Sequence, residues 1–185
     1  MRVVGGNFKG KTFKHKISRN IRPTSDFVRE AIFDTLANYI NFENLIVLDL
    51  FAGTGMLGIE ALSRGASFCQ FVDNNKVAIE IISSNLNTLN IEKEKYKITF
   101  ADVFSFLRSY QSEKKFDLVF SDPPYGLELN NKLISHNGIK KIAKYGTIFI
   151  IEISNKETIN ENPNFKMFNK KNYGDTNILF FSYEC

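Results

Sequence analysis

The 185-residue chain contains only two cysteines and no apolar run long enough to span a membrane. Cys69 lies inside an apolar run and Cys185 is the last residue, so the pair offers neither a disulfide framework nor the spacing of metal ligands. We therefore expect a reducing environment and no bound metal. The most apolar segment, GTIFIIEI at 146–153, is far shorter than the roughly 20 residues that a helix needs to cross a bilayer. Because the N-terminus also lacks the apolar stretch of a signal peptide, we expect a cytoplasmic protein without a membrane partner.

Acidic side chains are missing from residues 1–25, which carry seven Lys or Arg. Residues 26–185 carry 17 basic and 20 acidic side chains, so the net charge of +4 divides into +7 and −3. A locally basic segment on a mildly acidic body favours an anionic macromolecular partner such as nucleic acid.

The length suits one compact domain, at a rule of ~150 residues per domain. The proportions of 43% hydrophobic and 24% charged residues are near globular averages, which excludes a disordered or collagen-like chain. Residues 1–22 alternate apolar and polar side chains around glycines, and this pattern predicts a basic N-terminal β-hairpin arm. Residues 23–185 then form a single domain. It opens with a helix capped near Ser25.

From residue 45 onward, short apolar runs alternate with helical stretches. The β-rich runs are 45–50, 68–73, 96–101, 116–121 and 146–153, and the helical stretches lie at about 54–64, 75–90, 103–111 and 129–145. This alternation predicts an α/β fold whose mostly parallel sheet carries helices on both faces. After Pro163, two further apolar segments joined at 173–175 predict a closing antiparallel hairpin, which brings the sheet to seven strands.

Ligands of open parallel sheets bind beyond the carboxyl ends of the strands, so each strand end is a candidate site. The first strand runs into the loop DLFAGTGMLG at 49–58, where Gly53 and Gly55 let the backbone turn tightly and approach a ligand. With Gly58 they also match the dinucleotide fingerprint G-x-G-x-x-G, and a plain connecting turn is a second alternative. Asp49 favours a cationic ligand group, an ammonium or a sulfonium, because its carboxylate would repel a pyrophosphate.

The next two strand ends also carry acids. Asp73 can accept two hydrogen bonds from ribose hydroxyls, whereas capping a turn or helix is its structural alternative. Asp102 can accept from an adenine amino group while Val103 packs on the ring, and an N-cap role for the helix at 103–111 is compatible with this. The candidate cofactor-binding residues are Asp49, Phe51, Ala52, Gly53, Thr54, Gly55, Asp73, Asn74, Asp102 and Val103.

The fourth strand ends in Ser-Asp-Pro-Pro-Tyr-Gly at 121–126. Two consecutive prolines fix the backbone and remove two donors, so the turn is rigid and presents Asp122 and Tyr125 to the crevice. A loop that only ends the strand is the alternative. The candidate catalytic residues are Asp122, Pro123, Pro124 and Tyr125.

These motifs, in this order, resemble the class I S-adenosylmethionine-dependent methyltransferases that methylate amino groups. The segments 22–36, 48–66, 116–125 and 173–176 further resemble the RsmD-type 16S ribosomal RNA guanine-N2 methyltransferases, so the resemblance covers nearly the whole chain. Asp73 is a mild departure, since such enzymes often carry Glu there, and 127–145 shows no recognisable pattern.

The resemblance implies a Rossmann-like fold, S-adenosylmethionine as cofactor and S-adenosylhomocysteine as its product. It implies that Asp122 and the Pro123 carbonyl accept hydrogen bonds from the target amine while Tyr125 stacks on the extruded base. The implied partner is 16S ribosomal RNA or the assembled small ribosomal subunit, and we expect a monomer. The expected RNA-binding residues are Lys9, Lys11, Lys14, Lys16, Arg22 and Arg29.

An ionised Asp122 can only accept hydrogen bonds, so it suits the N1–H and N2 amine of guanine better than the edge of adenine. A DNA or RNA adenine-N6 methyltransferase is the nearest alternative, although DNA enzymes usually carry a target-recognition domain for which 185 residues leave no room. An NAD-dependent oxidoreductase would leave the DPPY motif unexplained. A non-catalytic RNA-binding protein would not need intact Asp49, Asp73 and Asp122.

Overall fold

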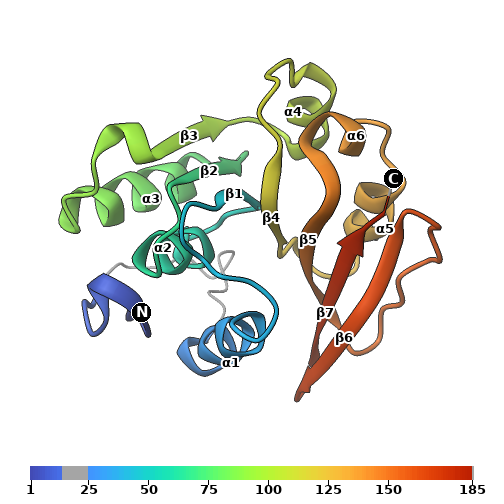
Figure 1. Cartoon of the computed structure of the whole chain (residues 1–185), viewed down its shortest axis with the longest axis horizontal. Helices are drawn as coiled ribbons and strands as arrows, with labels where there is room; N and C mark the ends of the chain where they lie inside the picture. The colour runs from blue at the N-terminus through green and yellow to red at the C-terminus, as the bar shows by residue number, and fades with distance from the viewer. Residues whose placement is uncertain (14–24, 185) are drawn as a thin grey trace.

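The computed structural model describes residues 1–13 and 25–184 (Figure 1). The strands are β1 (Ile46–Leu50), β2 (Phe68–Asp73), β3 (Tyr96–Phe100), β4 (Phe116–Ser121), β5 (Ala143–Ser154), β6 (Phe165–Tyr173) and β7 (Thr176–Tyr183). The helices are α1 (Asp26–Leu36), α2 (Met56–Ser63), α3 (Lys76–Thr88), α4 (Val103–Ser109), α5 (Leu129–Ile134) and α6 (Ile139–Ile142), with 3-10 turns η1 (Gly6–Phe8) and η2 (Lys93–Lys95).

The strands form one seven-stranded sheet in the order β3-β2-β1-β4-β5-β7-β6. Strands β1 to β5 pair in parallel, whereas β7 runs antiparallel to both of its neighbours, β5 and β6. The sheet is therefore mixed, and the predicted closing hairpin supplies its antiparallel edge. The order reverses at β1 and β4, which is where an open α/β sheet leaves a crevice for a ligand.

The sheet has a hydrophobic core on each face because successive strand residues point to opposite sides. On β1, Val47 belongs to the cluster packed against α1, α2 and α3, whereas Leu48 belongs to the cluster packed against α4, α5 and α6. Both side chains are fully buried. Strands buried on both faces explain why the runs in the sequence are continuously apolar.

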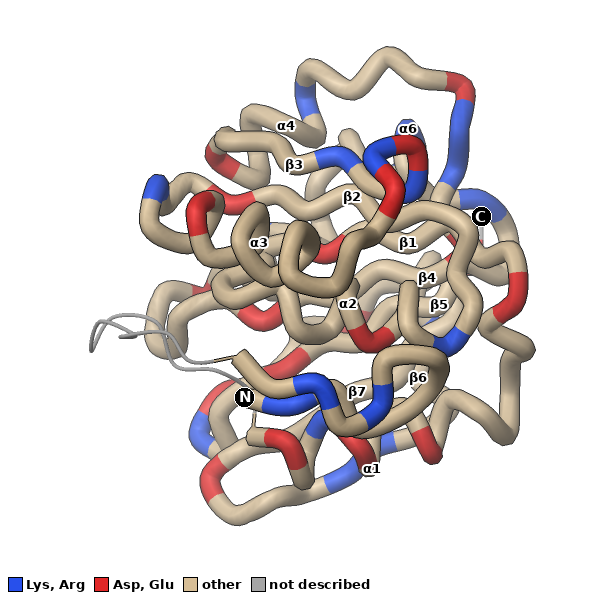
Figure 2. The backbone as a smooth tube through the Cα atoms, turned by 90° about the vertical axis from the view of Figure 1, so that its left-hand side faces the viewer, with Lys and Arg blue, Asp and Glu red and all other residues tan. Residues whose placement is uncertain are grey.

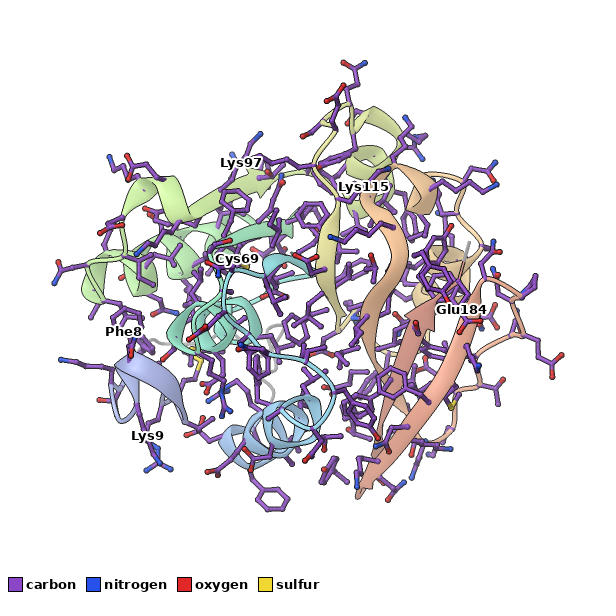
Figure 3. The ribbon with its side chains drawn as sticks, viewed as in Figure 1. Phe8, Lys9, Cys69, Lys97, Lys115 and Glu184 are labelled. Atoms are coloured by element: carbon purple, nitrogen blue, oxygen red, sulfur yellow. The ribbon has the colours of Figure 1, made fainter. Side chains whose placement is uncertain are left out.

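Two contacts fix the start of α2, the helix that follows the glycine loop. The N–H of Gly58 donates to Asp49 Oδ2 at 3.0 Å, which ties the first turn of the helix to β1. A Cβ at position 58 would lie 2.3 Å from Cε1 of Phe71 and 2.5 Å from Sγ of Cys69, so only glycine permits this close approach of helix and sheet. Cys69 lies in the interior of the protein, as Figure 3 shows.

The hairpin arm expected over residues 1–22 is not confirmed. Residues 1–13 contain one antiparallel bridge, between Arg2 and Thr12, around the 3-10 turn η1, and residues 14–22 lie outside the described residues. The segment is docked on the protein because its apolar residues Val3 and Val4 are buried. This segment therefore packs on the body of the protein, beside α2 (Figure 1).

Side chains of α2 hold this N-terminal segment in place. The N–H of Val4 donates to Glu60 Oε2 at 2.9 Å, and the N–H of Phe8 donates to Ser63 Oγ at 2.9 Å. Glu60 is fully buried and its other oxygen accepts from Arg64 Nε at 2.9 Å. These bonds join the segment to the helix that leaves the glycine loop.

Candidate cofactor and substrate site

A cavity of about 490 Å³ lies at the carboxyl ends of β1, β2, β4 and β5. It combines the glycine loop after β1, the acid at the end of β2 and the Asp-Pro-Pro-Tyr turn after β4. The predicted residues that line it are Asp49, Phe51, Ala52, Gly53, Thr54, Asp73, Asn74, Asp122, Pro123, Pro124 and Tyr125. Segments separated by about seventy positions therefore meet around one space, as expected for the carboxyl edge of a parallel sheet.

The glycine loop is a tight left-handed turn. Phe51, Gly53 and Gly55 have φ angles of +55°, +54° and +73°, a region that glycine enters without steric cost and that Phe51 occupies against its preference. The N–H of Gly55 donates to the Ala52 carbonyl at 2.7 Å, and the Asn85 side chain donates to the Thr54 carbonyl at 3.0 Å. Gly55 itself does not line the cavity and serves as the residue that starts α2.

Asp49 is 2% exposed at the floor of the cavity. Burial raises its pKa to about 8, the negative charge of Asp73 adds to this effect, and the hydrogen bond from Gly58 opposes it. Such a carboxyl is largely neutral at pH 7 unless a positive group lies beside it. This environment fits a cationic ligand group, since a neighbouring positive charge stabilises the ionised form of a buried acid.

Asp73 holds the loop that surrounds the cavity. Its Oδ2 accepts from the Gly53 N–H and its Oδ1 from the Asn75 N–H, both at 2.8 Å. A carboxylate has about four lone-pair sites, so these two bonds leave acceptor capacity on the cavity side. The alternative of a capping turn is thus realised at Asp73 without excluding a ligand role.

The Asp-Pro-Pro-Tyr turn is braced from three sides. The hydroxyl of Ser121 donates to Asn130 Oδ1 at 2.8 Å, and the Asn130 amide donates to the carbonyl of Glu152 at 2.8 Å. The Tyr125 hydroxyl lies 2.7 Å from Glu152 Oε1 and 2.8 Å from Thr176 Oγ1. Partial burial raises the pKa of the Tyr125 phenol above its ordinary value, so the hydroxyl keeps its proton and donates.

Sequence reasoning missed several residues that line the cavity: Ser25, Val28, Glu152, Tyr173 and Thr176. Ser25 is the N-cap of α1 and Val28 lies in its first turn, whereas Tyr173 ends β6 and Thr176 begins β7. Both segments belong to the stretches that resemble the RsmD-type family, so the sequence held a signal for Ser25, Val28, Tyr173 and Thr176. Glu152 gave no signal because it is one polar residue near the end of an apolar strand.

The structure does not bring Asp102 and Val103 to the cavity. Asp102 is exposed and its Oδ1 accepts from the Ser105 N–H at 2.9 Å, so it acts as the N-cap of α4. Val103 is 2% exposed in the core beneath that helix. Of the two roles weighed from the sequence, the described contacts correspond to the capping role.

The expected RNA-binding residues divide into three groups. Lys9 and Lys11 are exposed in the N-terminal segment, and Figure 3 shows Lys9 at the outer surface of the molecule. Lys14, Lys16 and Arg22 lie outside the described residues. Arg29 is a correction, because its side chain is fully buried and pairs with Asp26 at 2.8 Å and Glu60 at 3.8 Å. It joins α1 to α2 and offers no charge to a phosphate at the surface.

Within the described ranges, no group of three or more His, Cys, Asp or Glu side chains is placed to hold a metal ion. The same residues contain no helix that is long and apolar enough to cross a membrane.

The family model described as "Conserved hypothetical protein 95" matches residues 1–182. The chain belongs to this family. Among curated relatives in it, Ribosomal RNA small subunit methyltransferase D of Buchnera aphidicola is 34% identical over 169 residues, which cover 91% of this chain and 86% of the relative. The protein of the same name in Haemophilus influenzae is 30% identical over 174 residues, covering 94% and 89%. The resemblance to RsmD-type methyltransferases is thereby confirmed.

Solved structures agree with this family assignment. Escherichia coli yhhF, described provisionally as a methyltransferase, gives a TM-score of 0.82 at 25% identity and covers 100% of this chain and 98% of that chain. A Haemophilus influenzae protein described provisionally as a methylase gives 0.81 at 27% identity with the same coverage. A more distant neighbour, crystallised with S-adenosylhomocysteine, shares the fold with a TM-score of 0.61 at 14% identity. The predicted class I methyltransferase fold is confirmed.

Proposed function

We propose that this protein transfers a methyl group from S-adenosylmethionine to the exocyclic N2 amine of a guanine in 16S ribosomal RNA, as free RNA or within the assembled small subunit. The observation that carries the proposal is that the glycine loop, Asp73 and the Asp-Pro-Pro-Tyr turn line one cavity. The names of the curated relatives support ribosomal RNA of the small subunit as the substrate class. The choice of guanine N2 rests on the donor and acceptor argument below.

The cavity fits the cofactor in charge and in shape. Asp49 supplies a buried carboxyl that ionises beside a cation, and Asp73 keeps acceptor capacity for the hydroxyls of a ribose. The backbone at Gly53 approaches the cavity without a side chain in the way. When bound, S-adenosylmethionine supplies the electrophilic methyl group. The residues that would hold it are Asp49, Gly53 and Asp73 with their neighbours in the loop.

The other side of the cavity would hold the target base. The amine of a nucleobase is a poor nucleophile because its lone pair is delocalised into the ring. Asp122 and the Pro123 carbonyl would accept hydrogen bonds from its two N–H groups and localise the lone pair on nitrogen, while the Tyr125 ring stacks on the base. The bonds of Tyr125 to Glu152 and Thr176 hold the ring in one place before the base arrives.

Guanine is the better match for this arrangement. Its Watson–Crick edge presents N1–H next to the N2 amine, which are adjacent donors, whereas adenine presents one donor beside an acceptor. An ionised carboxylate only accepts, so Asp122 pairs with the donors of guanine. An asparagine at this position would suit adenine because its amide both donates and accepts.

The test is to change Asp122 and measure single-turnover methylation on small subunits from cells that lack the protein. We expect Asp122→Ala to abolish turnover and to leave the fold and cofactor affinity nearly unchanged, since this side chain is placed for the acceptor base. Asp122→Asn should reduce guanine N2 methylation about tenfold or more, because one charged hydrogen bond is replaced by a donor facing a donor. Mass spectrometry of the nucleosides identifies the product.

Two outcomes would contradict the proposal. Full guanine activity of Asp122→Asn would mean that Asp122 does not accept the donors of guanine. Methylation at adenine N6 by the unchanged protein would mean that the target base is adenine and not guanine. Calorimetric titration of each variant with S-adenosylmethionine is the control that separates loss of chemistry from loss of cofactor.

A further inference from the structure

We propose that Phe27 and Tyr173 form a stacking platform for the nucleotide that lies next to the methylated guanine in the RNA chain. This inference rests on the proposed function, since it assigns a place to a neighbour of the target base. Neither side chain belongs to the predicted catalytic or cofactor-binding residues. We call the two rings the rim pair.

The rim pair combines exposure with a fixed geometry. Phe27 is 69% exposed although it lies in the first turn of α1, where an apolar ring gains nothing from contact with water. Its ring meets Tyr173 edge to face, with centroids 5.9 Å apart and planes at 86°. In such an edge-on contact, the ring that offers its edge keeps both of its faces uncovered by the other. A flat surface is therefore available at this point.

The rim pair lies at the mouth of the cavity. Tyr173 lines the cavity itself, as do Ser25 and Val28, the residues that flank Phe27 and Asp26 on α1. In Figure 1 the turn that joins β6 to β7 lies beside α1. A base that reaches Asp122 has left its stack, and its neighbour in the chain stays outside within one backbone step.

The chemistry of the rim suits a single-stranded nucleotide. Aromatic faces stack with any base, and cations nearby hold the phosphate. Lys171 is exposed and precedes Tyr173 by two positions on β6, so strand alternation puts both side chains on the same face. An aromatic face with a lysine beside it is the combination expected for base stacking plus backbone contact.

Crosslinking shows directly which nucleotide lies against the Phe27 position. The variant Phe27→p-benzoylphenylalanine carries a photoreactive side chain at position 27. This variant is mixed with S-adenosylhomocysteine and with small subunits from cells that lack the protein, and the mixture is irradiated. Primer extension then maps the crosslinked nucleotides. We expect crosslinks at a nucleotide adjacent to the guanine that the unchanged protein methylates on the same subunits. Tyr145, which is 72% exposed in β5 and does not line the cavity, is the matched control position and should give none there.

A substitution series tests stacking against mere packing. Phe27→Ala should weaken binding to these subunits about tenfold, Phe27→Leu should weaken it nearly as much despite its apolar bulk, and Phe27→Trp should retain it. A thermal unfolding midpoint that changes little in all three variants excludes a purely structural role. Tyr145→Ala should match the unchanged protein in both measurements.

The outcomes separate the two proposals. Absence of methylation by the unchanged protein on both the subunits and free 16S ribosomal RNA overturns the proposed function and this inference with it. Methylation together with crosslinks remote from the guanine, or with equal binding by Phe27→Ala, overturns the stacking platform alone.

Discussion

We expect Asp49 to link S-adenosylmethionine binding to pH. Its pKa of about 8, against an ordinary carboxyl value of 3.8, means that the cofactor-free protein holds a proton there below pH 8. A cation requires the ionised form, so binding below that pH must release the proton. We expect S-adenosylmethionine affinity to rise up to about tenfold per pH unit as pH increases toward 8 and then to level off. Calorimetry in buffers of different ionisation enthalpy measures both the affinity and the released proton.

Asp49→Asn is the matched variant for this measurement. Any titration of the ligand itself is common to both proteins, so a steeper profile in the unchanged protein isolates Asp49. The stability of the cofactor-free protein should respond in the opposite sense. Because the folded state binds an extra proton between the ordinary carboxyl pKa and about 8, its free energy of unfolding falls as pH rises through that range. Asp49→Asn removes this fall, and equal profiles would contradict the assignment.

The place of some residues at the cavity was predictable from sequence and that of others was not. Asp73 and Asp122 line the cavity as expected, because acids at strand ends follow recognisable apolar runs. Asp102 was placed at the cofactor on the same logic, yet the cavity does not extend to it. The contacts of Glu152 and Thr176 with Tyr125 escaped prediction because they depend on the pairing of β5 with β7, a register that no local pattern encodes.

At the scale of elements, the hairpin of β6 and β7 braces the Asp-Pro-Pro-Tyr turn through Thr176. Thr176→Val keeps the shape of the side chain and removes its hydrogen bond to Tyr125. Since such a bond is worth about 0.5–1.5 kcal/mol, we expect kcat/KM for RNA to fall roughly twofold to tenfold. The dissociation constant of the cofactor should stay the same. Ser182→Ala, on the same strand but outside the cavity, is the control. Equal kcat/KM for the two variants would mean that the hairpin has no role in catalysis.

The elements themselves followed the sequence closely, with an exception around 129–145. A single helix was expected there, whereas the structure has α5, α6 and an early start of β5 at Ala143. The reason is a bulge in β5, where the register with β4 shifts and Gly146 has a φ of +83°. The strand was expected to begin at Gly146, whereas in the structure this glycine lies inside β5.

At the scale of the whole molecule, the charge is divided between a basic N-terminus and a mildly acidic body. Figure 2 shows basic positions of the N-terminal segment near the chain start and beside α1. We expect RNA binding to depend strongly on salt and the dependence to weaken when four of these lysines become glutamine. Each lost phosphate contact should reduce the log–log slope by about 0.7–0.9. The variant replaces Lys9, Lys11, Lys14 and Lys16.

The control is a second quadruple variant that changes the net charge by the same amount at another part of the surface. It replaces four exposed lysines around β3 and the loop before β4, namely Lys93, Lys95, Lys97 and Lys114. Its salt slope should equal that of the unchanged protein. If both variants change the slope equally, net charge rather than the N-terminal segment controls RNA affinity.

The docking of the N-terminal segment on α2 can be followed by the exchange of its own amide hydrogens. The amide hydrogens of Val4 and Phe8 are held by side chains of Glu60 and Ser63, so they exchange with deuterated solvent only when the segment lifts from the helix. Such opening costs less free energy than unfolding the sheet, so these amides should exchange faster than those of β1. Hydrogen exchange followed by NMR therefore reports the free energy of lifting the segment from α2, and RNA bound at Lys9 and Lys11 should slow this exchange.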